Sequence, residues 1–198
     1  QKKTIILSTG MATLNDISNS LKILKRNGNK KIILLHCVSS YPTDDNRLNL
    51  NFMDTLKKKF NLEIGFSDHS KGELACLAAV SKGARVIEKH ITLSKNLIGP
   101  DHKSSFTIEE FKILVKKIRN LEKILGKYSK KFSKDEINVK TVSRKSIVTT
   151  KYLIKNHKII KSDLAFKRPG TGISPLEVNS IIGKKIKKAI EKNKIIKK

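Results

Sequence analysis

The stretch EIGFSDHS, residues 63–70, and the stretch RVIEKH, residues 85–90, decide the fold. Each begins as a short apolar run, and each brings a histidine to its end, His69 in the first stretch and His90 in the second. His90 comes 21 positions after His69, which leaves room for one helix, the crossover that joins parallel strands. This strand–helix–strand pattern predicts a parallel sheet whose strands end at one common edge.

The same alternation extends through the first part of the chain. Strands are predicted for 4–8, 31–37, 63–67 and 85–90, and helices for about 14–27, 48–60, 71–82 and 107–125. Capping boxes at Thr13–Asp16 and Thr107–Glu110 mark two helix starts. The pattern predicts an α/β fold of four βα units over residues 1–126. Two architectures fit, a small doubly wound sheet or half of a (β/α)₈ (TIM) barrel.

The remaining residues have a different texture. Residues 127–142 break the alternation and predict a linker, and residues 143–198 predict a separate small module. This module has short apolar pairs, a loop KRPGTGISP at 167–175, and a basic helix or short turns over 176–192. A module of this size buries little core, so we expect it to dock on another surface.

The net charge of +26 comes from 43 Lys and Arg against 17 Asp and Glu. Such an excess is found in proteins that bind nucleic acids or other polyanions. The lysines are spread along the whole chain and form no basic stripe with interleaved aromatic residues. We therefore favour a lysine-rich solvated surface, which would still attract anionic substrates, and keep a polyanion-binding protein as the alternative.

The cysteine content and hydropathy indicate a cytoplasmic protein. Cys37 and Cys76 lie in apolar runs without metal-ligand spacing, as expected of buried, reduced thiols. No apolar run approaches the ~20 residues of a membrane span, so we expect no membrane partner. The chain begins with Gln rather than Met, and we expect an upstream part.

Polar side chains gather where the predicted strands end, which is where α/β proteins bind ligands. His69 and His90 end neighbouring strands, and two neutral imidazoles with open positions suit a divalent ion such as manganese, cobalt or zinc. The alternative is that each is an ordinary hydrogen-bonded histidine.

Three other positions have alternative readings, and a fourth has one. Asp101 orients a sugar hydroxyl or completes a metal shell, or it belongs to a Gly-Pro-Asp turn. Arg168 is an anion-binding fork or a surface charge. Lys89 pairs with an anion, or strand alternation turns it away from His90. His36, in an apolar run, is expected in the core.

Seven ordered motifs resemble one family, the N-acetylneuraminate (sialic acid) synthases with their legionaminic and pseudaminic acid synthase relatives. They are ILSTGM (6–11), LLHCVSSYPT (34–43), IGFSDHS (64–70), VIEKHITL (86–93), GPDHKSS (99–105), SRKSIV (143–148) and KRPGTGI (167–173). The last two resemble the family's C-terminal antifreeze-like (SAF) domain. The resemblance implies the last four βα units of a TIM barrel at 1–126, a linker at 127–142 and a mostly-β SAF domain at 143–198.

The resemblance implies a condensation reaction. Phosphoenolpyruvate adds through its C3 to the aldehyde carbon of an open-chain N-acetylated hexosamine, water attacks C2, and phosphate leaves. The product is a nine-carbon 2-keto acid, made from N-acetylmannosamine or a relative, with legionaminic or pseudaminic acid synthesis as the alternative. An enol ether is a modest nucleophile, and a divalent ion makes the aldehyde more electrophilic as a Lewis acid.

The resemblance also implies roles for individual residues. His69 and His90 match the family's metal ligands, usually described with manganese. Ser39, Tyr41 and Ser67 match positions that contact phosphoenolpyruvate. At Ser39 the sialic acid synthases often carry Asn, and this departure points toward the legionaminic branch.

Two further roles involve the sugar. Asp101 matches a carboxylate that holds the sugar and assists proton transfer. Arg168 matches an arginine that reaches from one subunit's SAF domain into the partner's barrel, so a domain-swapped homodimer is expected. Asn156-His157 departs from the family's Gly-Glu, but Asn tolerates positive φ, which would preserve the turn.

The family's barrel has eight strands, and this chain matches only the last four. Four strands do not close a barrel and leave parallel edges unpaired. We therefore expect the C-terminal part of a synthase that is inactive without its upstream half. A non-catalytic remnant or sensor is a further alternative.

Overall fold

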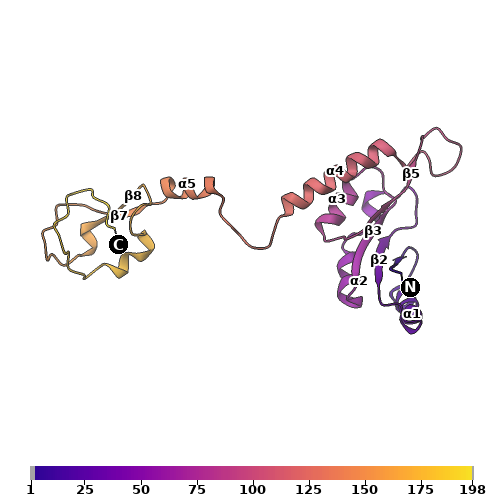
Figure 1. Ribbon diagram of the computed structural model, residues 1–198, viewed down its shortest axis with the longest axis horizontal. Helices are drawn as coiled ribbons and strands as arrows, with labels where there is room; N and C mark the ends of the chain where they lie inside the picture. Colours follow the sequence, from indigo (N-terminus) through magenta and orange to yellow (C-terminus); the bar gives the residue numbers. More distant parts are fainter. Residues whose placement is uncertain (1–2, 198) are drawn as a thin grey trace. The chain divides into compact units, whose positions relative to one another are not determined.

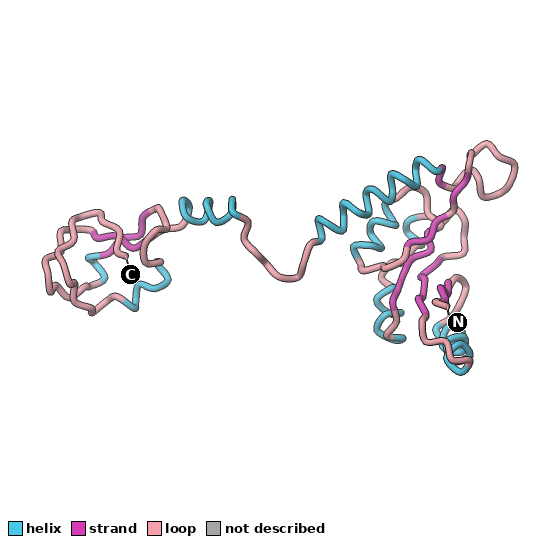
Figure 2. Tube along the Cα trace, in the orientation of Figure 1, coloured by secondary structure: helices cyan, strands magenta, loops and turns pink. Residues whose placement is uncertain are grey.

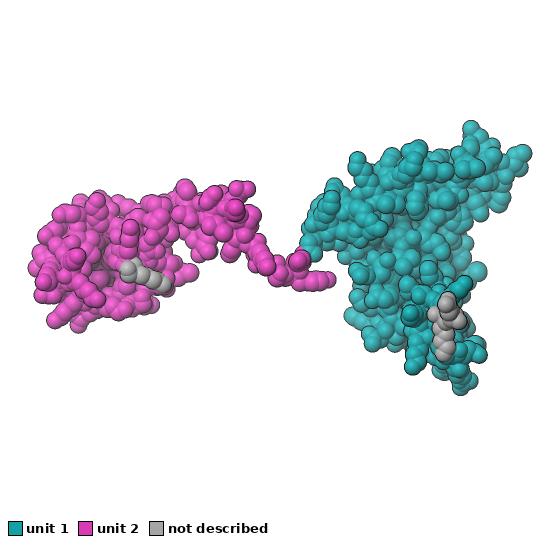
Figure 3. Space-filling model, in the orientation of Figure 1, with its two compact units in different colours: residues 1–126 teal, residues 127–198 magenta. Residues whose placement is uncertain are grey.

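The computed structural model describes residues 3–197. Its contacts divide the chain into two compact units, residues 1–126 and residues 127–198, drawn in different colours in Figure 3. Each unit has its own core and is described by itself. Within the described residues, no helix is both long and apolar enough to cross a membrane.

The first unit is built on one parallel sheet (Figure 1). Its strands stand in sequence order: β1 (Ile5–Ser8), β2 (Ile32–Cys37), β3 (Glu63–Asp68) and β4 (Ile87–Lys89). The register pairs Cys37 with Ser67 and Ser67 with Glu88. Because all strands run the same way, their carboxyl ends meet at one edge.

Helices follow the strands, as the alternation predicts. They are α1 (Leu14–Arg26), the short 3₁₀ helix η1 (Asp45–Arg47), α2 (Phe52–Phe60), α3 (Leu74–Ser81) and α4 (Ile108–Leu125). Both predicted capping boxes are present, with Thr13 and Thr107 each accepting from the backbone N–H three residues on. A small parallel pair, β5 (Ile91–Thr92) and β6 (Phe106–Thr107), lies between β4 and α4.

The core decides between the two predicted architectures. Helices α1, α2 and α3 all contribute to one cluster against alternate sheet residues, which therefore lie on one face: Ile32, Leu34, Ile64 and Phe66. In a doubly wound fold the helices cover both faces. Here they cover one, and the curled sheet is part of a barrel wall, with the other face available to line a site.

The second unit contains little regular structure (Figure 2). Its elements are α5 (Lys134–Ser143), β7 (Ser146–Thr149), η2 (Lys161–Asp163), β8 (Leu164–Lys167) and η3 (Pro175–Ser180). Strands β7 and β8 pair antiparallel, and two small clusters centred on Ile147 and Leu153 form the core. Asn156 has φ +69°, so the turn predicted to tolerate Asn is present.

Two segments of this unit differ in detail from their sequence readings. Most of the segment read as a linker is α5, which begins at a capping box of Ser133 and Glu136. The segment 176–192, for which a basic helix or short turns were expected, holds most of η3 followed by turns.

Candidate functional site

The two histidines that end β3 and β4 lie side by side. The ring centroids of His69 and His90 are 5.1 Å apart, with the rings at 82° to each other. Tyr41 joins them from the loop after β2: its ring stacks on His90 at 4.3 Å and meets His69 edge-on at 5.3 Å. Three residues predicted for the site thus form one aromatic cluster at the carboxyl edge of the sheet.

The Nδ1 surroundings of the two imidazoles, a hydrogen bond at His69 and a nearby carboxylate at His90, fit metal binding. His69 Nδ1 lies 2.8 Å from the carbonyl oxygen of Val38, which only accepts, so Nδ1 carries the hydrogen and Nε2 keeps its lone pair. His90 Nδ1 lies 3.7 Å from Asp101 Oδ2. A metal-binding histidine typically directs its other nitrogen at a carbonyl or carboxylate in this way.

The described residues contain no group of three or more His, Cys, Asp or Glu side chains arranged around a common ion. A metal held by His69 and His90 would therefore take its remaining ligands from elsewhere.

Ser67 and Glu88 lie beside the histidines on the same face of the sheet. Side chains alternate along a strand, so Ser67 shares a face with His69, and Glu88 shares it with His90. Ser67 is buried, and its hydroxyl donates to Glu88 Oε1 at 2.7 Å. The sequence analysis assigned no role to Glu88. Its position two residues before His90 in the same strand already placed both side chains on one face of the sheet.

The helix-covered face of the same strands carries a separate buried ion pair. Lys89 Nζ lies 2.7 Å from Asp68 Oδ2, and the two side chains are 2% and 0% exposed. Cys76 Sγ donates to the same oxygen at 3.0 Å, and burial, reinforced by the Asp68 charge, raises the pKa of this thiol. Lys89 therefore points away from His90, the second of the two readings of its position.

Loop residues complete the carboxyl edge. Tyr41 OH lies 3.1 Å from Ser105 Oγ, and Ser105 donates to the carbonyl of Asp101 at 2.8 Å, which ties the loop after β2 to the loop before β6. Ser39 is exposed on the β2 loop beside Gly10, where an added Cβ would collide with the Ser39 hydroxyl. No sequence signal singled out Ser105.

Two residues from apolar or stiff segments lie elsewhere. His36 is buried as expected, between Phe52 and Phe66, and burial lowers its pKa although its bond to the Leu48 carbonyl opposes this. Arg168 belongs to the second unit, is exposed, and donates from Nε to the carbonyl of Ser143 at 2.8 Å. The other six predicted site residues all belong to the first unit and lie at the carboxyl edge of its sheet.

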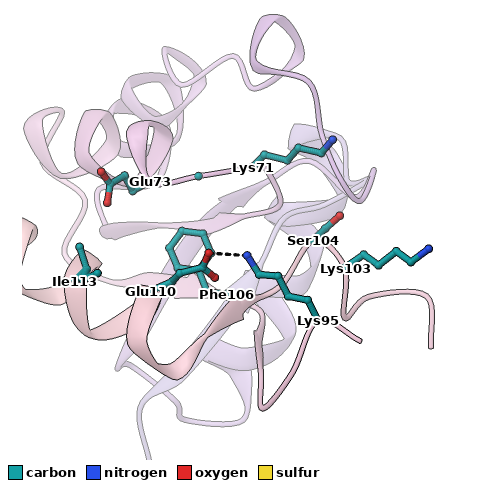
Figure 4. A pocket seen from close by; sticks show the side chains of 9 residues that line it. Lys71, Glu73, Lys95, Lys103, Ser104, Phe106, Glu110 and Ile113 are labelled. Atoms are coloured by element: carbon teal, nitrogen blue, oxygen red, sulfur yellow. Dashed lines mark hydrogen bonds and ion pairs between the residues drawn. The ribbon is translucent and has the colours of Figure 1, made fainter. Parts of the chain in front are cut away.

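A surface pocket of about 430 Å³ lies beside this edge, between the loop before α3 and the start of α4 (Figure 4). Lys95 in this pocket turns toward Glu110, with Nζ 2.6 Å from Oε1. None of the predicted site residues lines the pocket. We place the candidate site at the histidine pair, because an open sheet face need not enclose a cavity.

The fold and the histidine pair define a class: an α/β partial barrel with strand-end imidazoles, followed by a small β-containing domain. Residues 1–130 match the model of the NeuB family, and residues 144–198 match that of the SAF domain. The chain belongs to the NeuB family.

Similar proteins support this assignment. The chain is 44% identical to the N,N'-diacetyllegionaminic acid synthase of Campylobacter jejuni over 98% of its own length and 59% of that protein's. It is 39% identical to a pseudaminic acid synthase of the same species, over 96% and 55% of the two lengths. A putative spore coat polysaccharide biosynthesis protein E of Chromobacterium violaceum shares the fold, with a TM-score of 0.83 at 23% identity over 100% of this chain and 60% of that one. The chain thus spans less than two thirds of these relatives.

Proposed function

We propose that the whole protein condenses phosphoenolpyruvate with an N-acetylated hexosamine, giving a nine-carbon 2-keto sugar acid. The observation that carries the proposal is the side-by-side placement of His69 and His90 at the carboxyl ends of adjacent strands in a NeuB family chain. The homologues named as acid synthases support the same reaction class.

The described barrel portion corresponds in this proposal to the last four βα units of an eight-stranded barrel. Among the described strands, β1 and β4 each have one unpaired side in the sheet. Unpaired parallel edges next to a functional face are what a half-barrel presents before its other half joins it. The first half would also supply the remaining contacts to phosphoenolpyruvate.

His69 and His90 would hold a divalent ion, for which manganese is our first choice. When bound, that ion supplies Lewis-acid polarisation of the sugar aldehyde. The chain's own residues orient the rings: Val38 fixes the tautomer of His69, and Asp101 faces His90. Tyr41 stacks on His90 and limits its rotation.

The remaining residues would bind and orient the two substrates. Ser39, Tyr41 and Ser67 would hold phosphoenolpyruvate, and Asp101 would hold the sugar and assist proton transfer. In the reaction, C3 of phosphoenolpyruvate bonds to the aldehyde carbon, whose oxygen takes a proton. Water then adds to C2 and loses a proton. As the C2–O bond to phosphate breaks, the new hydroxyl loses its proton to leave the ketone, and the released phosphate takes up a proton.

The substrate is a second question, and the relatives are consistent with both the sialic acid type and the legionaminic or pseudaminic type of product. The similarity to a diacetyllegionaminic acid synthase, with Ser39, supports a legionaminic-type product alongside the sialic acid type. The three carbons of phosphoenolpyruvate carry no nitrogen, so both acetamido groups of an N,N'-diacetyl product must come with the sugar. A diacetamido hexose is therefore the substrate to compare with N-acetylmannosamine.

Phosphate release by the full-length protein tests the proposal. With phosphoenolpyruvate, either sugar and manganese, we expect phosphate release that falls at least about 100-fold in His69→Ala and in His90→Ala. Glu63→Gln, which changes an exposed carboxylate at the far end of β3, serves as the control. Full activity in both alanine variants would reject the metal role.

A further inference from the structure

Glu88 occupies an unusual place on the sheet face that carries the two histidines. Its side chain lies opposite Ser67 in the register and on the same face as His90, two residues further along the strand. Two residues of strand span about 6.6 Å. Glu88 is therefore one strand repeat from His90, and Ser67, to which it is hydrogen-bonded, is one repeat from His69.

The charge of Glu88 is not neutralised by any cation in the described part of the chain. Its hydrogen bond there comes from the Ser67 hydroxyl at 2.7 Å, a neutral donor. The cation next to it in sequence, Lys89, is bound on the opposite face to Asp68 and to the Ser70 carbonyl. A carboxyl group thus faces the site without a cationic partner in the described part of the chain.

A pair of imidazoles alone is a poor site for a dication. Neutral imidazoles bring lone pairs but no charge, and the described residues place no third His, Cys, Asp or Glu at the same point. Negative charge close to the ligands is what raises affinity for a dication in such sites. Asp101 supplies some of it from a loop, where its side chain is 54% exposed. Glu88 is also exposed in the described unit, but its backbone is fixed in a strand of the sheet that carries the two histidines.

We infer that Glu88 is a positioning residue of the metal site. Its charge strengthens the binding of the dication held by His69 and His90 from outside the two ligands, and its hydrogen bond sets the direction of the Ser67 hydroxyl. The inference rests on the proposed function, since it presupposes that these two histidines bind a metal.

The Ser67 bond adds a second consequence. A serine hydroxyl has one hydrogen, and Glu88 accepts it here. The oxygens of an ionised phosphate also only accept. The Ser67 hydroxyl must therefore break its hydrogen bond to Glu88 before it can donate to a bound phosphate. The strength of that bond adds to the free energy that phosphate binding must supply.

Calorimetric titration of manganese alone into the metal-free, full-length protein tests the inference. We expect Glu88→Gln to raise the dissociation constant for manganese at least about 10-fold, as is found when residues that contact metal ligands from outside are replaced. Glu88→Asp, which keeps the charge, should retain most of the affinity. Raising the ionic strength should reduce the difference in manganese affinity between the wild type and Glu88→Gln, because salt screens the attraction between the carboxylate and the ion.

The matched control is Glu63→Gln, an exposed carboxylate at the far end of β3 that pairs with Arg85. It should bind manganese as the wild type does. If the wild type binds manganese, His69→Ala does not, and Glu88→Gln binds as tightly as the wild type, the role of Glu88 is wrong and the proposed metal site stands. If His69→Ala also binds normally, the metal site itself is wrong, and the inference falls with it.

Discussion

At the scale of single residues, Asp163 organises the irregular backbone of the second unit. Its side chain is fully buried and lies 2.6 Å from His157 Nε2 and 3.0 Å from Lys151 Nζ, and it accepts the N–H of Ile160 at 3.0 Å. Burial alone would raise the pKa of this carboxyl, but the bonds from Ile160, His157 and Lys151 outweigh it and lower the pKa to about 2. The folded unit therefore stabilises the ionised form of the Asp163 carboxyl group.

Replacing Asp163 with Asn should therefore destabilise this unit. Since a carboxylate partner of three donors is lost, we expect exchange protection of β7 and β8 to fall about 5–30-fold near neutral pH. Hydrogen–deuterium exchange of the full-length protein measures this, with the exposed Asp135→Asn as control. Equal protection in the two variants would contradict the role.

The same residue sets an acid dependence whose sign is fixed. A folded pKa of about 2 lies below the unfolded value of about 3.9, so the contribution of Asp163 is complete above about pH 4 and is lost as the pH falls toward 2. The difference between wild type and Asp163→Asn should shrink over that range. A difference that stays constant from pH 5 to about pH 2 would show that the charge of Asp163 is not what stabilises the unit.

At the scale of elements, strand β3 packs closely against its two neighbouring strands at Gly65. Gly65 lies between β2 and β4, and an added Cβ would lie 2.5 Å from the Val86 carbonyl oxygen and collide with the Leu35 side chain. The backbone oxygen has no room to rotate away. Glycine is needed here for close packing of the strands that carry Ser67 and His69.

Gly65→Ala should cost roughly 3 kcal/mol of unfolding free energy, at the upper end of overpacking effects. Gly72→Ala is the matched control, because its Cβ would meet open space and only its φ of +71° costs energy, about 1 kcal/mol. Denaturant unfolding of the full-length protein compares them. If the two variants lose equal unfolding free energy, the neighbours of Gly65 move aside without a measurable penalty.

At the scale of the whole molecule, the residues predicted for the site are divided between two units. The histidine pair lies in the first unit and Arg168 in the second. We predict that Arg168 acts across a homodimer, reaching the barrel of the partner subunit. The spread of lysines over both units fits a solvated surface, and the polyanion-binding alternative stays untested.

Mixing two inactive variants tests whether Arg168 acts in trans. In a dimer of one Arg168→Ala and one His69→Ala subunit, one of the two sites would combine an intact barrel with an intact arginine. Random exchange of subunits should then restore about a quarter of the wild-type activity. Mixtures that stay inactive although subunits exchange would place Arg168 in the site of its own chain.

The sequence by itself determined what depends on neighbours along the chain. Apolar runs and capping boxes set the strands of the sheet and the starts of α1 and α4, because a strand's burial and a helix's first turn are encoded within a few residues. The ordered motifs around His69 and His90 were enough to identify the family. Helix α5 was missed because its residues are exposed and show no apolar face.

Only the tertiary structure decided which residues meet across strands. The register β3–β4 places Ser67 against Glu88 and sends Lys89 to Asp68 on the opposite face. The one-sided core distinguished a half-barrel from a doubly wound sheet, which strand order along the chain leaves open. Register and curl are set by packing between segments distant in sequence, so no local pattern encodes them.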